Sequence, residues 1–437
     1  MIIDEEILKD GISPAILAKF ISRHSLEQER FEKLYNYYIG NHAICERRRL
    51  SEGIANNKIV CNHAKYIVDI AKSYLVGNPV AYTCSDGYDI EAVKNCFAQQ
   101  DIASLDAELE KTMSIYGKAY EFIYADGESQ PRSVSLPPTN TFIVYGSGVG
   151  EFPLYGIHYY KKHDIDGSVT GVCCVVCDNN IIYTYENDAD SFLNMKLTNR
   201  ERHYFGKLPL IEYRNNEEKQ GDFEQLISLI DAYNLLESDR VNDKEQFVDA
   251  FLFLTGIDLD SEQAKKLREE RILMGYDGAQ AQYLSKALSE SDVQVLRDSL
   301  KTDIHRFSMI PDLTDQTFGT NLSGVAIKYK LMGFEQHVRN KERYFAKSLK
   351  KRFELYVNFL SLKGAMENVP VHRIDIVFTR NLPVNELEIS QMVRNLSGIA
   401  TSETLLAQLS FVGDPKEEAQ LAAKERKLDE KMKYVQE

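Results

Sequence analysis

The spacing of apolar residues divides the chain into helical and strand-like stretches. Apolar positions three and four apart predict a helix that starts at Ser13 and stops at Gly40. The same spacing predicts a helix over residues 62–75 and two more over residues 89–116. Between residues 119 and 213, short apolar and aromatic runs alternate with turn residues, which predicts a mostly antiparallel β region.

The second half of the chain is expected to alternate helices with a small α/β insert. The pattern first predicts a helix from Asp222, as its N-cap, to about Gln246. The insert that follows is expected to contain a strand over 249–257, a short helix from Asp260 to Arg271, and strands over 272–274 and 282–284. After the insert we expect a helix from Ser291, in a capping box with Gln294, to Ile310, then a polar loop over 312–324 and a long helix from Val325 to about Leu362. The long helix has an apolar face made of Leu331, Phe334, Val338, Phe345, Leu349 and Phe353. A strand over 373–378, helices near 386–396 and 402–409, and a last helix from Asp414 complete an α+β fold.

Composition bounds the class of protein. The 437 residues are 43% hydrophobic and 27% charged, which is ordinary for a globular chain of about two to four domains. No apolar run approaches the roughly 20 residues that span a membrane, and the N-terminus lacks the basic and apolar regions of a signal peptide. We therefore expect a protein of cytoplasmic origin with no membrane partner.

The seven cysteines are expected to be reduced, because their number is odd and no export signal accompanies them. Cys173, Cys174 and Cys177 lie close together in a predicted strand. Neighbours in a strand point to opposite faces, and Cys173 and Cys177 would be about 13 Å apart, too far for one zinc ion. They are expected to be buried structural residues.

Catalytic motifs are missing from the chain. It has no P-loop, no His-Glu-x-x-His and no Gly-x-Ser-x-Gly motif. We therefore expect no enzymatic activity, no catalytic residue, no metal and no cofactor.

Charge is distributed unevenly. The net charge of −14 argues against a protein that wraps nucleic acid, because such proteins neutralise phosphates with clustered Lys and Arg. Acidic residues concentrate on the helix that follows Gly221, and the candidates there are Glu237, Asp239, Asp243 and Glu245. Taken alone, this pattern favours a solvated helix face.

Short motifs in a fixed order carry a resemblance to a known family. They are Tyr38-Ile39-Gly40-Asn41-His42, Asn56-Asn57-Lys58-Ile59-Val60, Ala64-Lys65-Tyr66-Ile67-Val68-Asp69, Gly77-Asn78-Pro79, Gly221-Asp222-Phe223-Glu224, Ile230-Asp231-Ala232-Tyr233-Asn234, Ser238, Asn242-Asp243, Ile310-Pro311-Asp312, Phe318-Gly319 and Ser323-Gly324-Val325-Ala326. With the order of helix, insert, helix, polar loop and very long helix, they resemble phage portal proteins of the SPP1 type over about residues 10–415.

The resemblance implies a portal fold with a mixed α/β wing, a two-helix stem, a small α/β clip, a long wing helix and a helical C-terminal crown. Carried over by position, the wing would be 1–221 and 325–380, the stem helices 222–247 and 288–311, the clip 248–287, the tunnel loop 312–324 and the crown 381–437. The acidic stem face would then repel the DNA backbone and keep the duplex centred. The loop residues expected to face DNA are Thr314, Asp315, Thr317, Phe318, Gly319, Thr320, Asn321 and Ser323.

The same resemblance implies partners and a location. The chain would form a ring, commonly of twelve copies, at one capsid vertex of the virion, after assembly in the host cytoplasm. Its other partners would be double-stranded DNA held without sequence preference, the terminase large subunit, the head–tail connector or adaptor, and the major capsid and scaffold proteins. The alternative from another class is a minor head protein or adaptor without a DNA channel.

Two basic clusters leave alternatives open. Arg47, Arg48 and Arg49 could contact DNA or a neighbouring subunit. Lys347, Lys350, Lys351 and Arg352 could pair with acidic residues of the next subunit. Surface ion pairs on solvated faces are the commoner explanation for both clusters.

Overall fold

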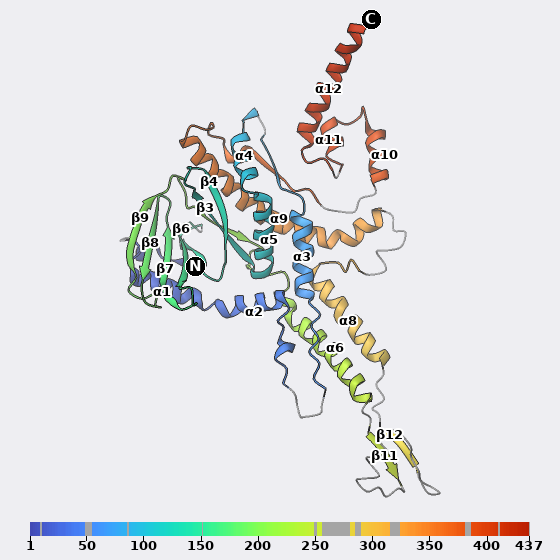
Figure 1. Cartoon of the computed structure of the whole chain (residues 1–437). Helices are drawn as coiled ribbons and strands as arrows, with labels where there is room; N and C mark the ends of the chain where they lie inside the picture. Colours follow the sequence, from blue (N-terminus) through green and yellow to red (C-terminus); the bar gives the residue numbers. More distant parts are fainter. Residues whose placement is uncertain are drawn as a thin grey trace. The chain divides into compact units, whose positions relative to one another are not determined.

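The computed structural model describes the chain except for residues 9–10, 49–54, 85–86, 151, 249–250, 256–279, 285–289, 315–323, 381–385, 410 and 437. Contacts between backbone segments divide it into two compact units. The first comprises Met1–Ile39, Ala64–Gln225 and Arg306–Glu437, and the second comprises Gly40–His63 and Leu226–His305. The mixture of helices and separate sheets is α+β, as expected from the sequence (Figure 1).

The larger sheet of the first unit has six strands in the order β1-β5-β6-β7-β8-β9. These are β1 (Ile2–Ile3), β5 (Thr141–Gly146), β6 (Pro153–His163), β7 (Val169–Cys177), β8 (Ile181–Asn187) and β9 (Lys196–Arg202). All neighbouring pairs are antiparallel except β1 with β5. Asp178 holds the turn between β7 and β8, because its Oδ1 accepts hydrogen bonds from the Asn180 and Ile181 amides, each at 2.7 Å.

One face of this sheet is covered by α1 (Pro14–Ser25). Leu17, Phe20 and Ile21 pack there against alternate strand residues such as Val144 and Cys174. The helix expected to continue to Gly40 is interrupted, and α2 (Gln28–Ile39) follows as a separate helix. The break is a tightened turn in which the Glu27 amide bonds the His24 carbonyl at 3.0 Å.

The three nearby cysteines are buried as expected. Cys174 belongs to the core beneath α1, whereas Cys177 belongs to a core on the opposite side of the sheet. Burial raises the pKa of the Cys177 thiol to about 12, so this thiol is protonated at neutral pH. The part of the chain that the structure describes contains no group of His, Cys, Asp or Glu side chains arranged to hold a metal ion.

A second sheet of the first unit has the order β10-β3-β4, with β3 (Lys118–Ala125), β4 (Pro131–Leu136) and β10 (Leu210–Arg214). It contacts α5 (Ile102–Tyr116) and the long helix α9 (Gly324–Leu362). The apolar face predicted for α9 is confirmed, because all of its members are buried: Leu331, Phe334, Val338, Phe345, Leu349 and Phe353. The aromatic rings of Phe345 and Tyr213 lie 5.1 Å apart.

The basic cluster on α9 is not a surface cluster throughout, which corrects one expectation. Arg352 is fully buried, and it donates to Asp106 of α5 at 2.6 Å and to Glu121 of β3 at 2.7 Å. Its partners therefore lie in its own chain. A buried charge is tolerated only when it is paired in this way.

The remaining elements of the first unit are η1 (Glu5–Leu8), α3 (His63–Val76), α4 (Glu91–Gln99), η4 (Glu224–Leu226), η6 (Val371–Arg373), the antiparallel pair β2 (Ala81–Cys84) and β13 (Ile374–Val377), α10 (Glu386–Leu396), α11 (Ser402–Leu406) and α12 (Pro415–Gln436). Asp414 caps α12 as predicted, because its Oδ1 accepts from the Glu417 amide at 3.0 Å. Every helix within the described residues is too short or too polar to cross a membrane.

The second unit contains η2 (Ala43–Glu46), α6 (Ile227–Val248), α8 (Glu290–Ser308), whose last turn enters the first unit, and the antiparallel pair β11 (Phe251–Thr255) and β12 (Gln280–Leu284). The expected helix, strand and helix order is therefore present. Asp222 is not the N-cap of α6, because a 3-10 turn over Glu224–Leu226 intervenes. Ser291 lies inside α8 rather than before it. The helix expected from Asp260 to Arg271 and the strand over 272–274 lie outside the described residues.

Candidate functional site

Most of the acidic residues predicted on α6 form ion pairs or hydrogen bonds with other residues of the same chain. Glu237 forms an ion pair with Arg297 of α8, and Asp239 forms one with Arg47 at 2.6 Å. Glu245 accepts a hydrogen bond from Asn57 Nδ2 at 2.9 Å. Asp243 is half-buried, and none of the described residues pairs with it in the structure. Part of the acidic face is thus neutralised within the subunit.

α6 and α8 are joined by further ion pairs within the second unit. Arg240 of α6 pairs with Glu290 at the first turn of α8, and Lys244 Nζ lies 3.3 Å from the same carboxylate. Negative charge at a helix N-terminus is stabilised by the helix dipole, so Glu290 is well placed. The cations beside it lower the pKa of Glu290. These ion pairs hold α6 and α8 against each other.

A ladder of polar side chains on α6 holds the extended segment 57–61, a contact that was not predicted from the sequence. Asn57, Ile59 and Cys61 donate their amides to Asn242 Oδ1 at 2.7 Å, Ser238 Oγ at 3.0 Å and Asn234 Oδ1 at 2.8 Å, respectively. Residues 234, 238 and 242 are four apart on one helix face, which is a rise of about 6 Å per step. Alternate residues of an extended chain advance by about 6.6 Å, so the two repeats match.

The ladder residues are themselves held in place. Ser238 Oγ donates to the Asn234 carbonyl at 2.7 Å, which leaves its lone pair for the Ile59 amide. Asn234 Nδ2 and His42 Nδ1 are 2.7 Å apart. All three ladder side chains are buried, so loss of any one would leave an amide without its partner. We call Asn234, Ser238 and Asn242 the polar ladder.

The segment that precedes α6 is fixed within the first unit by charged and steric contacts. Lys341 of α9 donates to Asp222 Oδ2 and to Glu110 Oε1, each at 2.7 Å. Burial opposes the charge on Asp222, but Lys341 outweighs it and holds the pKa of that carboxyl well below its usual range. A Cβ on Gly221 would lie 2.3 Å from the Ile115 carbonyl oxygen, so only glycine fits there.

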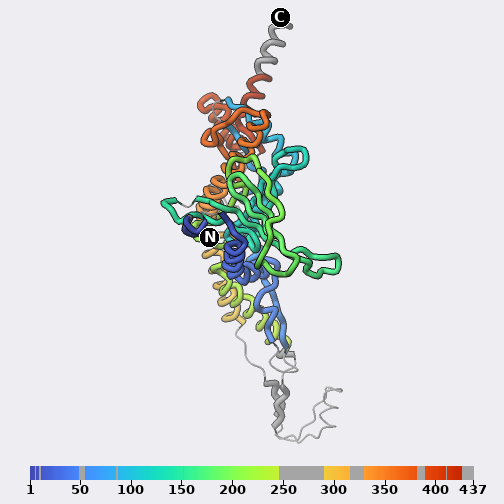
Figure 2. The backbone as a smooth tube through the Cα atoms, turned by 90° about the vertical axis from the view of Figure 1, so that its left-hand side faces the viewer, coloured from blue at the N-terminus to red at the C-terminus, as the bar shows by residue number. Residues whose placement is uncertain are grey.

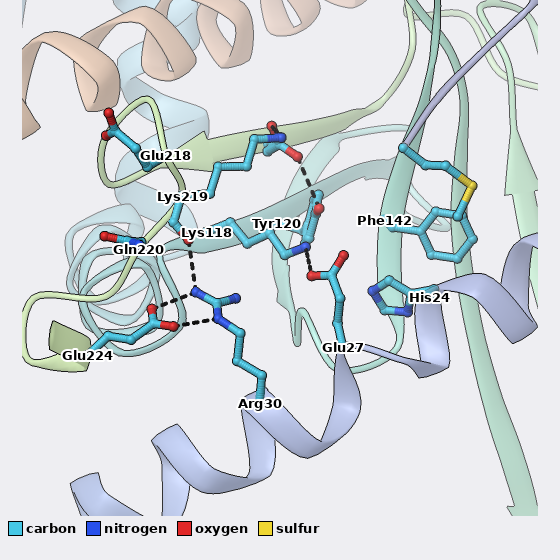
Figure 3. A pocket seen from close by; sticks show the side chains of 12 residues that line it. His24, Glu27, Arg30, Lys118, Tyr120, Phe142, Glu218, Lys219, Gln220 and Glu224 are labelled. Carbon is cyan, nitrogen blue, oxygen red and sulfur yellow. Dashed lines mark hydrogen bonds and ion pairs between the residues drawn. The ribbon is translucent and has the colours of Figure 1, made fainter. Parts of the chain in front are cut away.

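A polar cavity of about 330 Å³ lies beside this segment (Figure 3). Arg30 makes a two-pronged ion pair with Glu224, both contacts at 2.6 Å, and Lys118 donates to Glu27 at 2.7 Å. Glu224 also accepts from the Gly221 amide at 3.1 Å. The charges at the cavity are therefore already paired, and they hold the segment that ends at Glu224 within the first unit.

Two groups at this cavity have strongly shifted pKa values. Burial lowers the pKa of His24 to about 4, and Lys118 adds to the effect. Burial opposes ionisation of Glu212, but Lys219 and Arg214 outweigh it and lower its pKa to about 2. His24 is consequently neutral and Glu212 ionised at pH 7. Neither environment can be predicted from the sequence, because the partners lie far apart along the chain.

The start of the predicted DNA-facing loop is anchored on α3. The Tyr66 hydroxyl donates to the Pro311 carbonyl at 3.1 Å and accepts from the Leu313 amide at 2.9 Å. Asp312 Oδ1 accepts from the Thr314 amide at 3.0 Å. Of the loop candidates, Thr314 is described, and the others lie outside the described residues: Asp315, Thr317, Phe318, Gly319, Thr320, Asn321 and Ser323.

Comparison with known proteins identifies the family. A family model described as phage portal protein, SPP1 Gp6-like, matches residues 17–432. The portal protein of Bacillus phage SPP1 is 26% identical over 432 residues, covering 92% of this chain and 84% of that protein. The portal protein of Clostridium phage phiCD119 is 22% identical over 398 residues, covering 86% of each chain. This chain belongs to the phage portal protein family, whose members are structural proteins of the virion.

A solved structure described as the neck of an empty GTA particle, computed with C6 symmetry, also matches. It has 11% sequence identity and a TM-score of 0.45, and the match covers 86% of this chain and 92% of that one. This likeness is too distant to support an inference about function.

Proposed function

We propose that the chain is one subunit of a closed ring, commonly of twelve copies, at one vertex of a phage capsid. The ring forms a channel through which double-stranded DNA enters during packaging and leaves during ejection. The observation that carries this proposal is the match of the portal family model to residues 17–432 of the 437-residue chain.

The parts of the chain have roles by position in this proposal. Residues 222–247 and 288–311 are the stem helices, and 248–287 form the clip that docks the terminase large subunit and later the head–tail connector. Residues 1–221 and 325–380 form the wing, 312–324 the tunnel loop and 381–437 the crown, which meets capsid and scaffold proteins. The order of α6, the β11–β12 pair, α8 and α9 supports this assignment.

The acidic face of α6 acts in this proposal by repulsion. Carboxylates repeated around a ring repel the phosphate backbone and keep the duplex centred, whereas basic side chains would bind it and slow its passage. Since Glu237 and Asp239 already pair with Arg297 and Arg47, Asp243 is the residue that best carries this role.

A charge reversal tests this role. Asp243→Lys is expected to slow translocation in a packaging assay while rings still assemble. Glu237→Lys is unsuitable, because it also breaks the Arg297 ion pair. The matched control is Glu108→Lys, an equal charge change at an exposed position of α5. Equal packaging rates for Asp243→Lys and the control would contradict the role.

Deletion of Thr314 to Ser323 tests the tunnel loop separately. The polar residues there offer weak, easily exchanged contacts to phosphate, and Gly319 permits hinge-like backbone conformations. Packaging is expected to fall while rings assemble normally. Unchanged packaging by the deletion variant would count against the assignment.

A further inference from the structure

The loop between β5 and β6 exposes apolar side chains to solvent. Val149 is 104% exposed and Phe152 is 59% exposed, and glycines occupy positions 146, 148 and 150. The loop is closed at its base, because the Gly146 amide donates to the Phe152 carbonyl at 2.9 Å. Single exposed apolar residues are common, but an apolar loop tip that nothing covers costs free energy unless a partner buries it.

A partly apolar groove of about 750 Å³ lies elsewhere in the same unit. It is lined by Ala18 and Ile21 of α1, Tyr159 and Tyr160 of β6, and Phe192 and Leu193 of the connection after β8. Leu193 is 64% exposed, so apolar surface is open to a partner there. The volume of the groove exceeds that of a Val and a Phe side chain together.

The loop and the groove lie at opposite ends of β6. The loop ends where β6 begins at Pro153, and the groove is lined by the later residues Tyr159 to Lys161 and His163. Tyr160 lies eight positions after Phe152, which is about 26 Å along an extended chain. The loops at the two ends of β6 project from opposite sides of this unit (Figure 2). The loop therefore cannot fill the groove of its own subunit.

We propose that the β5–β6 loop of one copy inserts Val149 and Phe152 into this groove of the next copy. A surface that meets a different surface on an identical partner makes a head-to-tail contact, and such contacts form a ring when the rotation between neighbours closes. The inference rests on the proposed ring and names the contact that links its neighbours.

Charge is compatible with this pairing. Lys161 is the ionised residue among those that line the groove, and it already lies 2.8 Å from Asp190, so charge does not oppose the entry of apolar side chains. Burial of Val149 and Phe152 supplies the main stabilisation.

Disulfide cross-linking tests the contact directly. With Val149→Cys and Leu193→Cys in one chain, oxidation is expected to produce a ladder of covalent multimers on a non-reducing gel. Each single variant controls for the seven native cysteines and is expected to remain a single chain. Closed rings without a ladder would overturn this contact and leave the ring proposal standing. Failure of the unmodified chain to form rings would overturn both.

A matched pair of substitutions gives a second test. Val149 and Ile165 are both 104% exposed on hairpin loops, at opposite ends of β6, so neither substitution should disturb folding. Val149→Asp is expected to raise the protein concentration for half-maximal ring assembly at least tenfold, whereas Ile165→Asp is expected to leave it unchanged. Equal assembly of the two variants would contradict the proposal.

Discussion

Lys341 Nζ lies 2.7 Å from Asp222 Oδ2, and this ion pair ties the long helix α9 to the segment around Asp222 within the first unit. The same ammonium lies 2.7 Å from Glu110, and the side chains of both carboxylates are fully buried. One cation thus compensates two buried anions. A buried arrangement of this kind is sensitive to loss of any member, because the remaining charges cannot be solvated.

Lys341→Met is therefore expected to lower the free energy of unfolding by about 3–5 kcal/mol, because Glu110 and Asp222 would lose their shared cation. Chemical denaturation of the purified chain measures this loss. Lys347→Met, at an exposed position of the same helix, is the control and should change stability by less than about 0.5 kcal/mol. Similar losses for the two variants would show that the ion pairs of Lys341 with Glu110 and Asp222 do not stabilise the fold.

The polar ladder makes a position-specific prediction. Ser238→Ala removes the acceptor of the Ile59 amide, so hydrogen exchange at Ile59 is expected to accelerate roughly tenfold, with a smaller effect at Cys61. Asn234→Ala should shift the largest effect to Cys61. Exchange measured by NMR or by mass spectrometry of short peptides distinguishes the two. Uniform acceleration over 57–61 in both variants would contradict the one-to-one register.

Two glycines respond oppositely to the same substitution. Gly221→Ala places a Cβ 2.3 Å from the Ile115 carbonyl oxygen and should reduce soluble folded protein or the melting temperature. Gly333→Ala has nothing within 4 Å, and its position inside α9 should make the change neutral or stabilising by up to about 1 kcal/mol. Thermal unfolding of both variants checks the contrast. A stable Gly221→Ala chain would disprove the close approach to α5.

The pKa of His24 predicts a stability loss in mild acid. Its folded-state pKa is lowered from 6.5 to about 4, so the unfolded chain binds the proton more tightly. The stabilisation is complete above pH 6.5 and is lost as pH falls towards 4. Between pH 7 and pH 5 this group alone should cost about 2 kcal/mol. The unfolding free energy of His24→Gln should change less between pH 7 and pH 5 than that of the unmodified chain. An equal change in the two chains would show that His24 is not the source of the loss in acid.

The helices were predicted from the spacing of apolar residues along the chain. The apolar face of α9 was predicted residue by residue, because burial of one helix face against a sheet imposes a repeat that the sequence displays. The antiparallel β region over 119–213 was also visible, because turn chemistry such as that of Asp178 is local. These features depend on neighbours within a few residues.

Features that depend on distant partners were missed. Arginine usually lies on the surface, but Arg352 is buried. Its partners Asp106 and Glu121 lie more than 230 residues earlier in the chain, so the sequence around Arg352 does not indicate them. The polar ladder had a visible signal in Asn234, Ser238 and Asn242, spaced by four, but the segment 57–61 has no periodicity that points to it. The acidic face of α6 was likewise visible, whereas its partners Arg297 and Arg47 were not.

The central claim is that the chain forms a closed ring, and imaging of the purified protein down the ring axis tests it most directly. Negative-stain electron microscopy, with the particle mass measured in solution, should show closed rings of about twelve subunits around a central channel. A small open oligomer or a monomer at the same concentration would contradict the claim and favour an adaptor without a channel.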